Sequence, residues 1–175
     1  LGLEYDEVKA RITEALEMVG MTGFEDKTPH HLSGGQQKRV AIAGIIAMRP
    51  EIMILDEPTA GLDPKGRETV MKIISDYRLA TGATVIIISH SMEDMAKIAD
   101  KLLVLNDGEI MFFDTVANVF NNYEDLLDVG LDIPLITRIM LKLKEKGVDI
   151  SNNIYTVEDA VSEILNIAKG GTLND

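Results

Sequence analysis

The chain has 175 residues, which is long enough for one domain with a sizeable core, and its net charge of −12 opposes binding to nucleic acid or anionic lipid. Cysteine is absent, which excludes disulfides and thiolate metal sites and favours a reducing, cytoplasmic location. Nearly half of the residues are apolar, as is typical of an α/β fold with a parallel sheet, and no apolar run approaches the roughly 18 to 20 residues that span a bilayer.

The first quarter of the chain predicts two helices separated by a polar loop. Apolar residues recur at three- and four-residue spacing over residues 6–19, which indicates an amphipathic helix that ends at Gly20. The loop leads to Ser33-Gly34-Gly35, and a second helix is predicted over residues 37–48. A hydroxyl and two unobstructed backbone N–H groups at a helix N-terminus suit phosphate oxygens, but the same residues also make an ordinary helix cap and turn.

Two short apolar strands follow, and each ends on polar residues. The run over residues 52–55 ends on Asp56 and Glu57, as expected of a buried parallel strand that delivers acids at its carboxyl end. A helix predicted over residues 65–79 leads to a second buried strand, residues 84–89. The order strand, helix, strand predicts a parallel pair with a right-handed crossover.

The acids and the histidine after the second strand are candidates for phosphoryl transfer to water. Successive side chains point to opposite sides, so Asp56 can hold a metal ion while Glu57 orients or deprotonates water. His90 can contact a terminal phosphate or order that water. From the residues alone, the acids could equally cap the next turn, and a lone histidine is more often structural. We interpret His30 and His31 as surface or loop-packing residues rather than metal ligands.

The rest of the chain predicts a hairpin and then a helical tail. Ser91 can cap a short helix, and residues 106–108, Asn-Asp-Gly, form a turn between strands. Beyond residues 115–125, where we place a subdomain boundary, one helix is predicted behind Pro134 and a second after Thr156. Because an acid follows Thr156 three residues later, the start of the last helix resembles a capping box.

Taken together, these segments resemble the ATP-binding subunits of ABC transporters. Leu32-Ser33-Gly34-Gly35-Gln36 is similar to the ABC signature motif, and residues 52–57 to the Walker B strand. Residues 58–63 are similar to the segment that leads into the D-loop, and Ser89-His90 to the switch-histidine loop. The resemblance covers nearly the whole first two thirds of the chain. It implies a partial P-loop NTPase (ABC ATPase) domain of the α/β class, with a parallel sheet, a helical signature segment and a small C-terminal helical domain.

The resemblance also implies a role for each matched residue. Asp56 would support Mg²⁺, Glu57 would act as general base or water positioner, and His90 would sense the γ-phosphate. Asp63 would contact the opposing subunit of a head-to-tail dimer. ATP would lie between the phosphate-binding loop of one subunit and the signature residues of the other: Ser33, Gly34, Gly35 and Gln36.

Further segments are similar to the ATPases of energy-coupling-factor and cobalt-type importers: Pro29-His30-His31, Ile42-Ala43-Gly44 and residues 130–134. Those importers bring in vitamins or transition-metal ions such as cobalt and nickel. We therefore expect a homo- or heterodimeric ATPase at the cytoplasmic face of the membrane. Its expected partners are a membrane coupling protein and a substrate-capture protein, with no nucleic acid.

The family pattern divides the chain and reveals one departure. Residues 1–122 correspond to the C-terminal portion of an ABC ATPase domain, with a helical-subdomain remnant over about 1–48 and the catalytic core over about 49–122. Residues 123–175 correspond to a helical dimerisation domain. A Gly-x-x-x-x-Gly-Lys-Ser/Thr loop, a Gln loop and an adenine-stacking aromatic are missing from this sequence.

The missing loop leaves two interpretations of the chain, and two other functions compete with that of a transporter ATPase. We expect a fragment of a longer ATPase that is inactive by itself, and the alternative is a degenerate partner that contributes only its signature face. A soluble ABC ATPase of DNA repair or ribosomes would predict coiled-coil or basic inserts, which the acidic sequence does not show. A non-catalytic interaction module is the third hypothesis.

Overall fold

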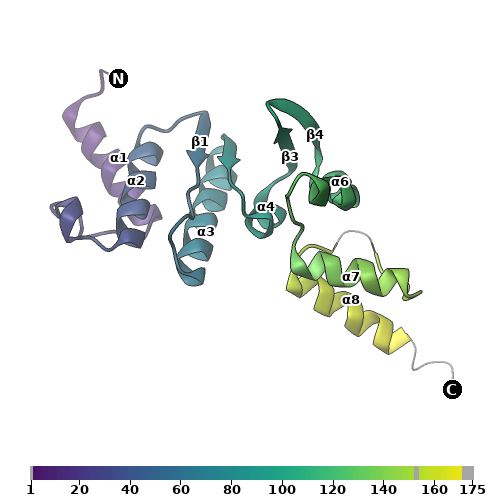
Figure 1. The fold of residues 1–175 in the computed structure, drawn as a ribbon. Helices are drawn as coiled ribbons and strands as arrows, with labels where there is room; N and C mark the ends of the chain where they lie inside the picture. The colour runs from purple at the N-terminus through teal and green to yellow at the C-terminus, as the bar shows by residue number, and fades with distance from the viewer. Residues whose placement is uncertain (1, 152–153, 171–175) are drawn as a thin grey trace. The chain divides into compact units, whose positions relative to one another are not determined.

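A computed structural model gives the fold of residues 2–151 and 154–170 (Figure 1). The chain forms two units, Leu1–Ser89 and His90–Asp175. The boundary predicted at residue 122 falls inside the second unit and stays a prediction. None of the helices in the described ranges is both long and apolar enough to cross a bilayer.

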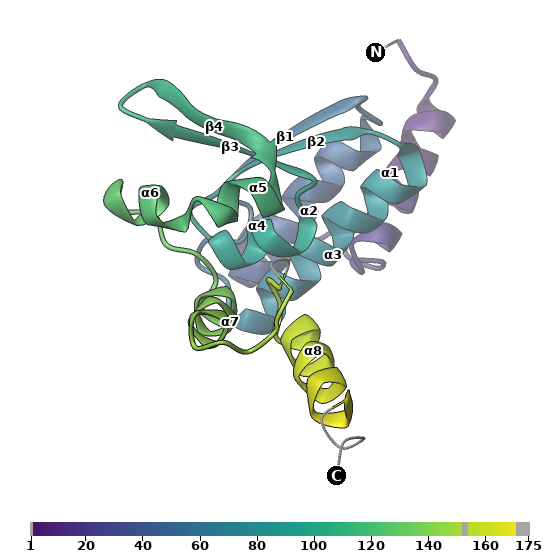
Figure 2. The same ribbon diagram turned by 90° about the vertical axis from the view of Figure 1, so that its right-hand side faces the viewer.

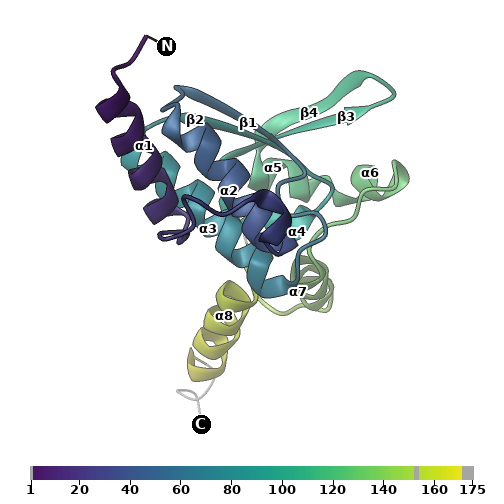
Figure 3. The same cartoon turned by 90° about the vertical axis from the view of Figure 1, so that its left-hand side faces the viewer.

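The first unit opens with two helices that pack along each other, α1 (Tyr5–Met18) and α2 (Gly34–Ala47) (Figure 3). Helix α2 begins three residues earlier than predicted, because the glycine pair forms its first turn instead of a loop. Arg39 of α2 donates hydrogen bonds to the carbonyls of Val19 and Gly20, at 3.1 and 3.3 Å. These contacts satisfy carbonyl groups at the end of α1, where a helix has no partners of its own.

The centre of this unit is a parallel pair of strands, β1 (Ile52–Asp56) and β2 (Thr84–Ile88), joined by helix α3 (Pro64–Thr81). The register pairs the first residues of the two strands with each other and likewise the last, so both strands end at the same edge. The predicted parallel pairing is confirmed. Helix α3 ends at Gly82, whose φ of 70° is the left-handed conformation that glycine adopts without strain.

The two strands bury only one of their faces, although the sequence predicts strands buried on both. Met53 and Leu55 are almost fully buried, whereas four isoleucines on the other face are between 46% and 61% exposed: Ile52, Ile54, Ile86 and Ile88. Helices α1, α2 and α3 lie on one side of the pair (Figures 2 and 3). An apolar run predicts burial on both faces only where helices cover both, and the described helices of this unit cover one.

The second unit begins with helix α4 (Met92–Ile98) and an antiparallel hairpin of β3 (Lys101–Asn106) and β4 (Glu109–Thr115). The turn residues Asp107 and Gly108 have positive φ, at 50° and 81°. This confirms the hairpin predicted from the Asn-Asp-Gly triplet, because those residues tolerate the left-handed region.

Two short helices follow the hairpin that the sequence did not predict, α5 (Val116–Asn121) and α6 (Tyr123–Asp128). Each has six residues, which is too short to display a helical period. Helix α5 is nevertheless well anchored, because Val119 and Phe120 are each 1% exposed. The Phe120 ring meets the ring of Tyr155 edge-on, with 5.5 Å between the centroids.

The tail of this unit has a small core of its own, formed by α7 (Leu135–Glu145), α8 (Val157–Gly170) and the segment that connects them. The core consists of four buried residues: Met140, Ile150, Ile154 and Ala160. The buried hydroxyl of Thr137 donates to the Ile154 carbonyl at 2.8 Å and fixes the segment before α8 onto α7. Both helices predicted for the tail are therefore confirmed.

The start of each tail helix is held by a carboxylate. Asp159 accepts a bond from the Thr156 hydroxyl at 2.6 Å, while its own N–H donates to that hydroxyl at 3.1 Å. Before α7, Asp132 pairs with Arg138 and accepts from the N–H of Ile133. The Arg138 guanidinium beside it, together with that N–H, holds the pKa of the Asp132 carboxyl below its usual value.

Candidate functional site

The two acids lie where β1 ends, beside the end of β2. Asp56 pairs in register with Ile88, and the N–H of Glu57 donates to the Ile88 carbonyl at 2.9 Å. Asp56 is exposed and Glu57 is half-buried. Open α/β sheets bind ligands outside the carboxyl ends of their strands, so the acids occupy the edge that the sequence predicts for them.

Glu57 has an unusual backbone conformation. Its φ is 46°, in the left-handed region that costs a non-glycine residue about 1 to 2 kcal/mol. Its carbonyl accepts a bond from the Lys38 ammonium at 2.8 Å and from the N–H of Ala60 at 3.2 Å. Because its N–H is also bonded, both peptide groups that flank Glu57 are held in place.

The predicted phosphate-binding turn forms the start of α2 and is closed by a capping box. The Ser33 hydroxyl accepts from the N–H of Gln36 at 3.3 Å, and the Gln36 side chain accepts from the N–H of Ser33 at 2.9 Å. The cap that the sequence left open as an alternative is therefore present. It leaves a side-chain-free surface at Gly34, where an added Cβ would meet nothing within 4 Å.

The loop before this turn is fixed by Gln37, whose side-chain amide donates to the carbonyls of Pro29 and Leu32 at 2.9 and 3.2 Å. His30 and His31 lie in a 3₁₀ turn, η1 (Pro29–His31), and are exposed, as predicted for loop residues. In residues 2–151 and 154–170, no three histidine or acidic side chains gather in a cluster that could hold a metal ion.

The segment after the acids returns toward the start of α2. Asp63 caps α3, because its carboxylate accepts from the N–H of Gly66 at 3.0 Å. The preceding residue, Leu62, lies close to residues 33–36, the signature turn. A Cβ added to Gly35 would be 3.8 Å from Leu62 Cδ2. The first unit thus brings the signature helix, the acids and the predicted D-loop together.

His90 is the first residue of the second unit and is exposed. It directly follows β2 and Ser89, as predicted from the sequence. Ser91 next to it caps α4, because its hydroxyl accepts from the N–H of Asp94 at 3.3 Å. The role of His90 toward a phosphate stays a prediction.

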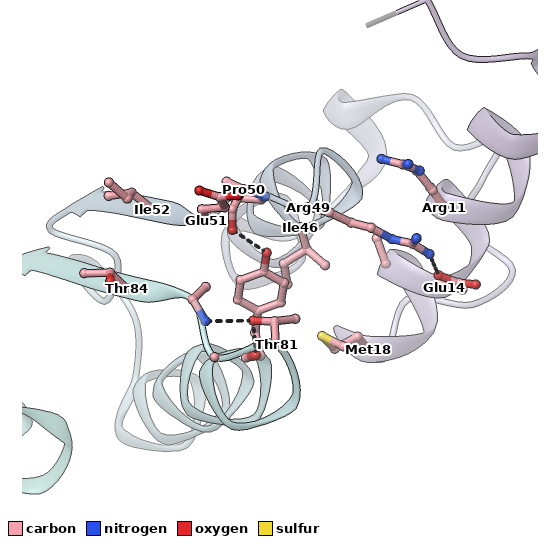
Figure 4. A pocket seen from close by; sticks show the side chains of 14 residues that line it. Arg11, Glu14, Met18, Ile46, Arg49, Pro50, Glu51, Ile52, Thr81 and Thr84 are labelled. Atoms are coloured by element: carbon pink, nitrogen blue, oxygen red, sulfur yellow. Dashed lines mark hydrogen bonds and ion pairs between the residues drawn. The ribbon is translucent and has the colours of Figure 1, made fainter.

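A cavity of about 680 Å³ lies at the opposite end of the strands, beside their first residues (Figure 4). It is lined by α1, the turn before β1 and the end of α3. Its polar groups pair with each other: Arg49 with Glu14 at 2.6 Å, and the Tyr77 hydroxyl with the Pro50 carbonyl at 3.1 Å. The cavity is therefore separate from the acids, which lie at the far end of β1.

Sequence reasoning missed three residues that organise this site: Gln37, Lys38 and Arg39. Each donates from α2 to a backbone carbonyl of another segment. Gln37 reaches the loop before α2, Lys38 reaches Glu57, and Arg39 reaches the end of α1. The only sequence signal is that three long polar side chains follow one another at the start of an otherwise apolar helix. That pattern by itself indicates solvent exposure, so their targets could not be predicted.

The chemistry of these groups fits magnesium and a nucleotide phosphate. Mg²⁺ prefers oxygen ligands and usually combines one or two carboxylates with substrate phosphates and water, so the exposed carboxylate of Asp56 is suited to it. The N-terminus of α2, with glycine at its first two positions, allows close approach of an anion.

Comparison with known proteins gives consistent matches. Residues 3–60 match the family model described as ABC transporter. The chain is 51% identical to the energy-coupling factor transporter ATP-binding protein EcfA2 of Clostridioides difficile, over 97% of this chain and 60% of that protein. It is 48% identical to the EcfA2 protein of Clostridium acetobutylicum, over 95% of this chain and 59% of that protein.

Two solved structures of ABC proteins also match this chain in fold. CbiO1 from Clostridium perfringens, described as part of the ABC transporter complex cbiONQ, matches with a TM-score of 0.65 and 38% identity over 80% of this chain and 56% of that one. The ATP-binding cassette MJ0796, solved as a dimer with ADP and Pi, matches with a TM-score of 0.58 and 32% identity over 66% of this chain and 50% of that one. The chain spans about 60% of the length of the relatives it matches in sequence.

Proposed function

We propose, from the premise that the chain belongs to the ABC transporter family of ATP-binding proteins, that residues 1–175 are part of the ATP-hydrolysing motor subunit of an energy-coupling-factor importer. The observation that carries the proposal is the placement of Asp56 and Glu57 at the carboxyl edge of the parallel pair. A direct contact from Lys38 joins Glu57 to the helix that begins at the signature turn.

In the proposed site, Asp56 holds Mg²⁺, which neutralises charge on the phosphate oxygens when bound. Glu57 orients the attacking water or accepts its proton, because its backbone is fixed beside Asp56. Gly34 and Gly35 offer backbone surface to phosphate oxygens at the start of α2, with Ser33 and Gln36 closing the turn. His90 contacts the γ-phosphate and Asp63 the opposing subunit.

The proposal requires a phosphate-binding loop, and residues 1–175 do not contain that motif. We propose that the loop lies in a longer polypeptide that contains these residues. A second ATPase subunit completes each site, with ATP shared between the phosphate-binding loop of one subunit and the signature turn of the other. The dimeric form of the related MJ0796 cassette supports this arrangement.

The transport role follows from the relatives, which are energy-coupling factor transporter ATP-binding proteins. The proposed partners are a membrane coupling protein and a substrate-capture protein, and the proposed location is the cytoplasmic face of the membrane. Vitamins and cobalt or nickel ions are the proposed cargo. Residues 123–175 are proposed to help pair the two ATPase subunits, because α8 exposes apolar side chains at helical spacing: Val157, Val161, Ile164 and Leu165.

The test is Glu57→Gln in the polypeptide that contains these residues together with a phosphate-binding loop. We expect ATP turnover to fall about 100-fold or more, with ATP still bound, because the amide cannot accept a proton from water. Glu68→Gln is the matched control, since Glu68 is an exposed residue of α3, and it should hydrolyse ATP at the normal rate. Near-normal turnover by Glu57→Gln would refute the assigned role. Residues 1–175 alone should show no turnover.

A further inference from the structure

Lys38 makes the contact in the first unit that reaches from the signature helix to the proposed general base. It lies in the second turn of α2, is half-buried, and donates from Nζ to the main-chain oxygen of Glu57 at 2.8 Å. We propose that Lys38 is a positioning residue for hydrolysis: it fixes the peptide group after Glu57 and thereby the direction of the Glu57 carboxylate. This inference rests on the proposed function.

The backbone at Glu57 needs such a contact for two reasons. Its φ of 46° is disfavoured for a residue with a side chain, and the residue before a proline is additionally driven toward an extended conformation. Glu57 precedes Pro58 and so has both restrictions. Without an external constraint, the backbone would relax toward the extended region and turn the Cα–Cβ bond with it.

The peptide bond between Glu57 and Pro58 can be held only through its oxygen, because proline has no N–H. Among the donors that reach that oxygen are the Lys38 ammonium at 2.8 Å and the N–H of Ala60 at 3.2 Å. The lysine bond is the shorter and is assisted by charge, so it is the stronger constraint. Loss of Lys38 would remove the stronger of these two bonds from the peptide group.

A small displacement of the carboxylate is enough to affect catalysis. A misplacement of about 1 Å of a reacting group costs on the order of 100-fold in rate. ATP itself is held by other groups in the proposed site, so its binding should change little. The expected signature of a positioning role is therefore a lower kcat with a nearly constant KM for ATP.

The contact also links two sites in the proposed dimer. The signature turn and Lys38 belong to the same helix, α2, and the signature turn faces the ATP held by the other subunit. Glu57 is the general base for the ATP of its own subunit. If α2 moves when the ATP of the other subunit binds or is hydrolysed, Lys38 would transmit that movement to Glu57.

The experiment compares Lys38→Met, Lys38→Gln and Lys38→Arg in the full-length ATPase assembled with its partners, with kcat and KM for ATP measured for each. We expect Lys38→Met to lower kcat about 10- to 100-fold with KM changed less than about twofold. Lys38→Arg keeps a charged donor and should restore most of kcat, and Lys38→Gln keeps a neutral donor and should be intermediate. If Lys38→Met does not fold, the test is the comparison of kcat between Lys38→Gln and Lys38→Arg.

Lys72→Met is the matched control. Lys72 is a lysine of α3 whose side chain is 73% exposed and pairs with Asp76 at 2.8 Å, so its loss should leave kcat and KM unchanged. The inference is overturned if the kcat of Lys38→Met stays within about twofold of normal, or if its KM rises while its kcat does not fall. It is also overturned if Lys38→Arg has a kcat no higher than that of Lys38→Met. Glu57→Gln in the same assay separates the two claims: normal turnover there refutes the proposed function, whereas loss there with normal Lys38→Met refutes only the role of Lys38.

Discussion

Gly66 lies in the first turn of α3, directly beside the carboxylate that caps the helix. Its N–H donates to Asp63 Oδ1, and a Cβ added to it would be 2.7 Å from that oxygen and 3.3 Å from Leu62 Cβ. Glycine in a helix usually costs about 1 kcal/mol relative to alanine. Here the missing side chain leaves space for the Asp63 cap, which offsets that cost.

A double-mutant cycle tests this account of Gly66. Gly66→Ala should change the free energy of unfolding little in the normal chain, because the helix gains about 1 kcal/mol of propensity and loses a cap of similar size. In an Asp63→Ala background there is no cap to displace, so the same change should stabilise by about 0.5 to 1 kcal/mol. Urea denaturation measures both effects. Equal stabilisation in the two backgrounds would show that the cap and the glycine are independent.

Local chemistry predicted part of the residue-scale structure. The Ser91 cap, the positive φ at Asp107 and the cap at Thr156 each depend on neighbours within three residues, so the sequence contains the necessary information. The contact of Lys38 with Glu57 joins residues 19 apart, and Glu57 has a left-handed backbone. Neither could be predicted, because local propensity favours an extended residue before proline.

At the scale of elements, prediction succeeded for helices with a visible apolar period or a capping residue and failed for two helices of six residues. Helix α3 with 18 residues and α8 with 14 were expected, whereas the six-residue helices α5 and α6 were not. The exposed isoleucine face of β1 and β2 was also missed. A continuous apolar run does not reveal on which faces helices pack, because that depends on the tertiary structure.

The buried bond between α7 and the segment before α8 gives a prediction at this scale. Thr137→Val keeps the side-chain shape but removes the hydroxyl that donates to the Ile154 carbonyl at 2.8 Å. Thr137 and Ile154 are each 3% exposed. We expect a loss of about 1 to 3 kcal/mol in the free energy of unfolding, because a buried carbonyl loses its partner. Urea denaturation is the measurement.

Thr69→Val serves as the control for that substitution. The Thr69 hydroxyl donates to the Lys65 carbonyl at the same distance, 2.8 Å, but in an exposed position on α3. Water replaces the lost donor there, so the change should stay within about 0.5 kcal/mol. If the two variants lose equal stability, burial of the Thr137 bond is not what stabilises the tail.

At the scale of the whole molecule, the predicted fold class is confirmed. Four short motifs in register predicted the fold of an ABC ATPase domain, and both the 51% identical relative and the TM-score of 0.65 to CbiO1 agree with that fold. The sequence could assign the fold because these motifs combine local backbone geometry with fixed order. The division of the chain at Ser89 was not predicted, since a boundary between compact units depends on long-range packing, and the subdomain boundary predicted at residue 122 stays a prediction.

The exposed apolar face of α8 gives the prediction for assembly. Val161 and Leu165 are 50% and 51% exposed and lie one turn apart. In the proposed dimer, changing both to Glu should weaken subunit pairing about tenfold or more, because charges would be buried in the contact. ATP affinity should be unchanged, since these side chains are remote in sequence from the signature and Walker B residues.

Sedimentation at several protein concentrations measures the pairing. The matched control places the same charges on the neighbouring polar positions, Ser162→Glu with Asn166→Glu, which are exposed and spaced identically on α8. That pair of changes should leave the dimer intact. Normal pairing by the Val161 and Leu165 variant would mean that the tail does not join the subunits.

The left-handed backbone at position 57 also limits how gene copies of this protein could lose the proposed hydrolytic activity over evolutionary time. Aspartate, asparagine and glycine enter that conformation at lower cost than other residues, whereas β-branched residues are the most strained there. A copy that keeps its fold while it drifts into a silent regulatory subunit is therefore expected to carry one of the first three at this position. Valine and isoleucine should be rare among such copies, even though residues at the end of a β-strand are otherwise often β-branched.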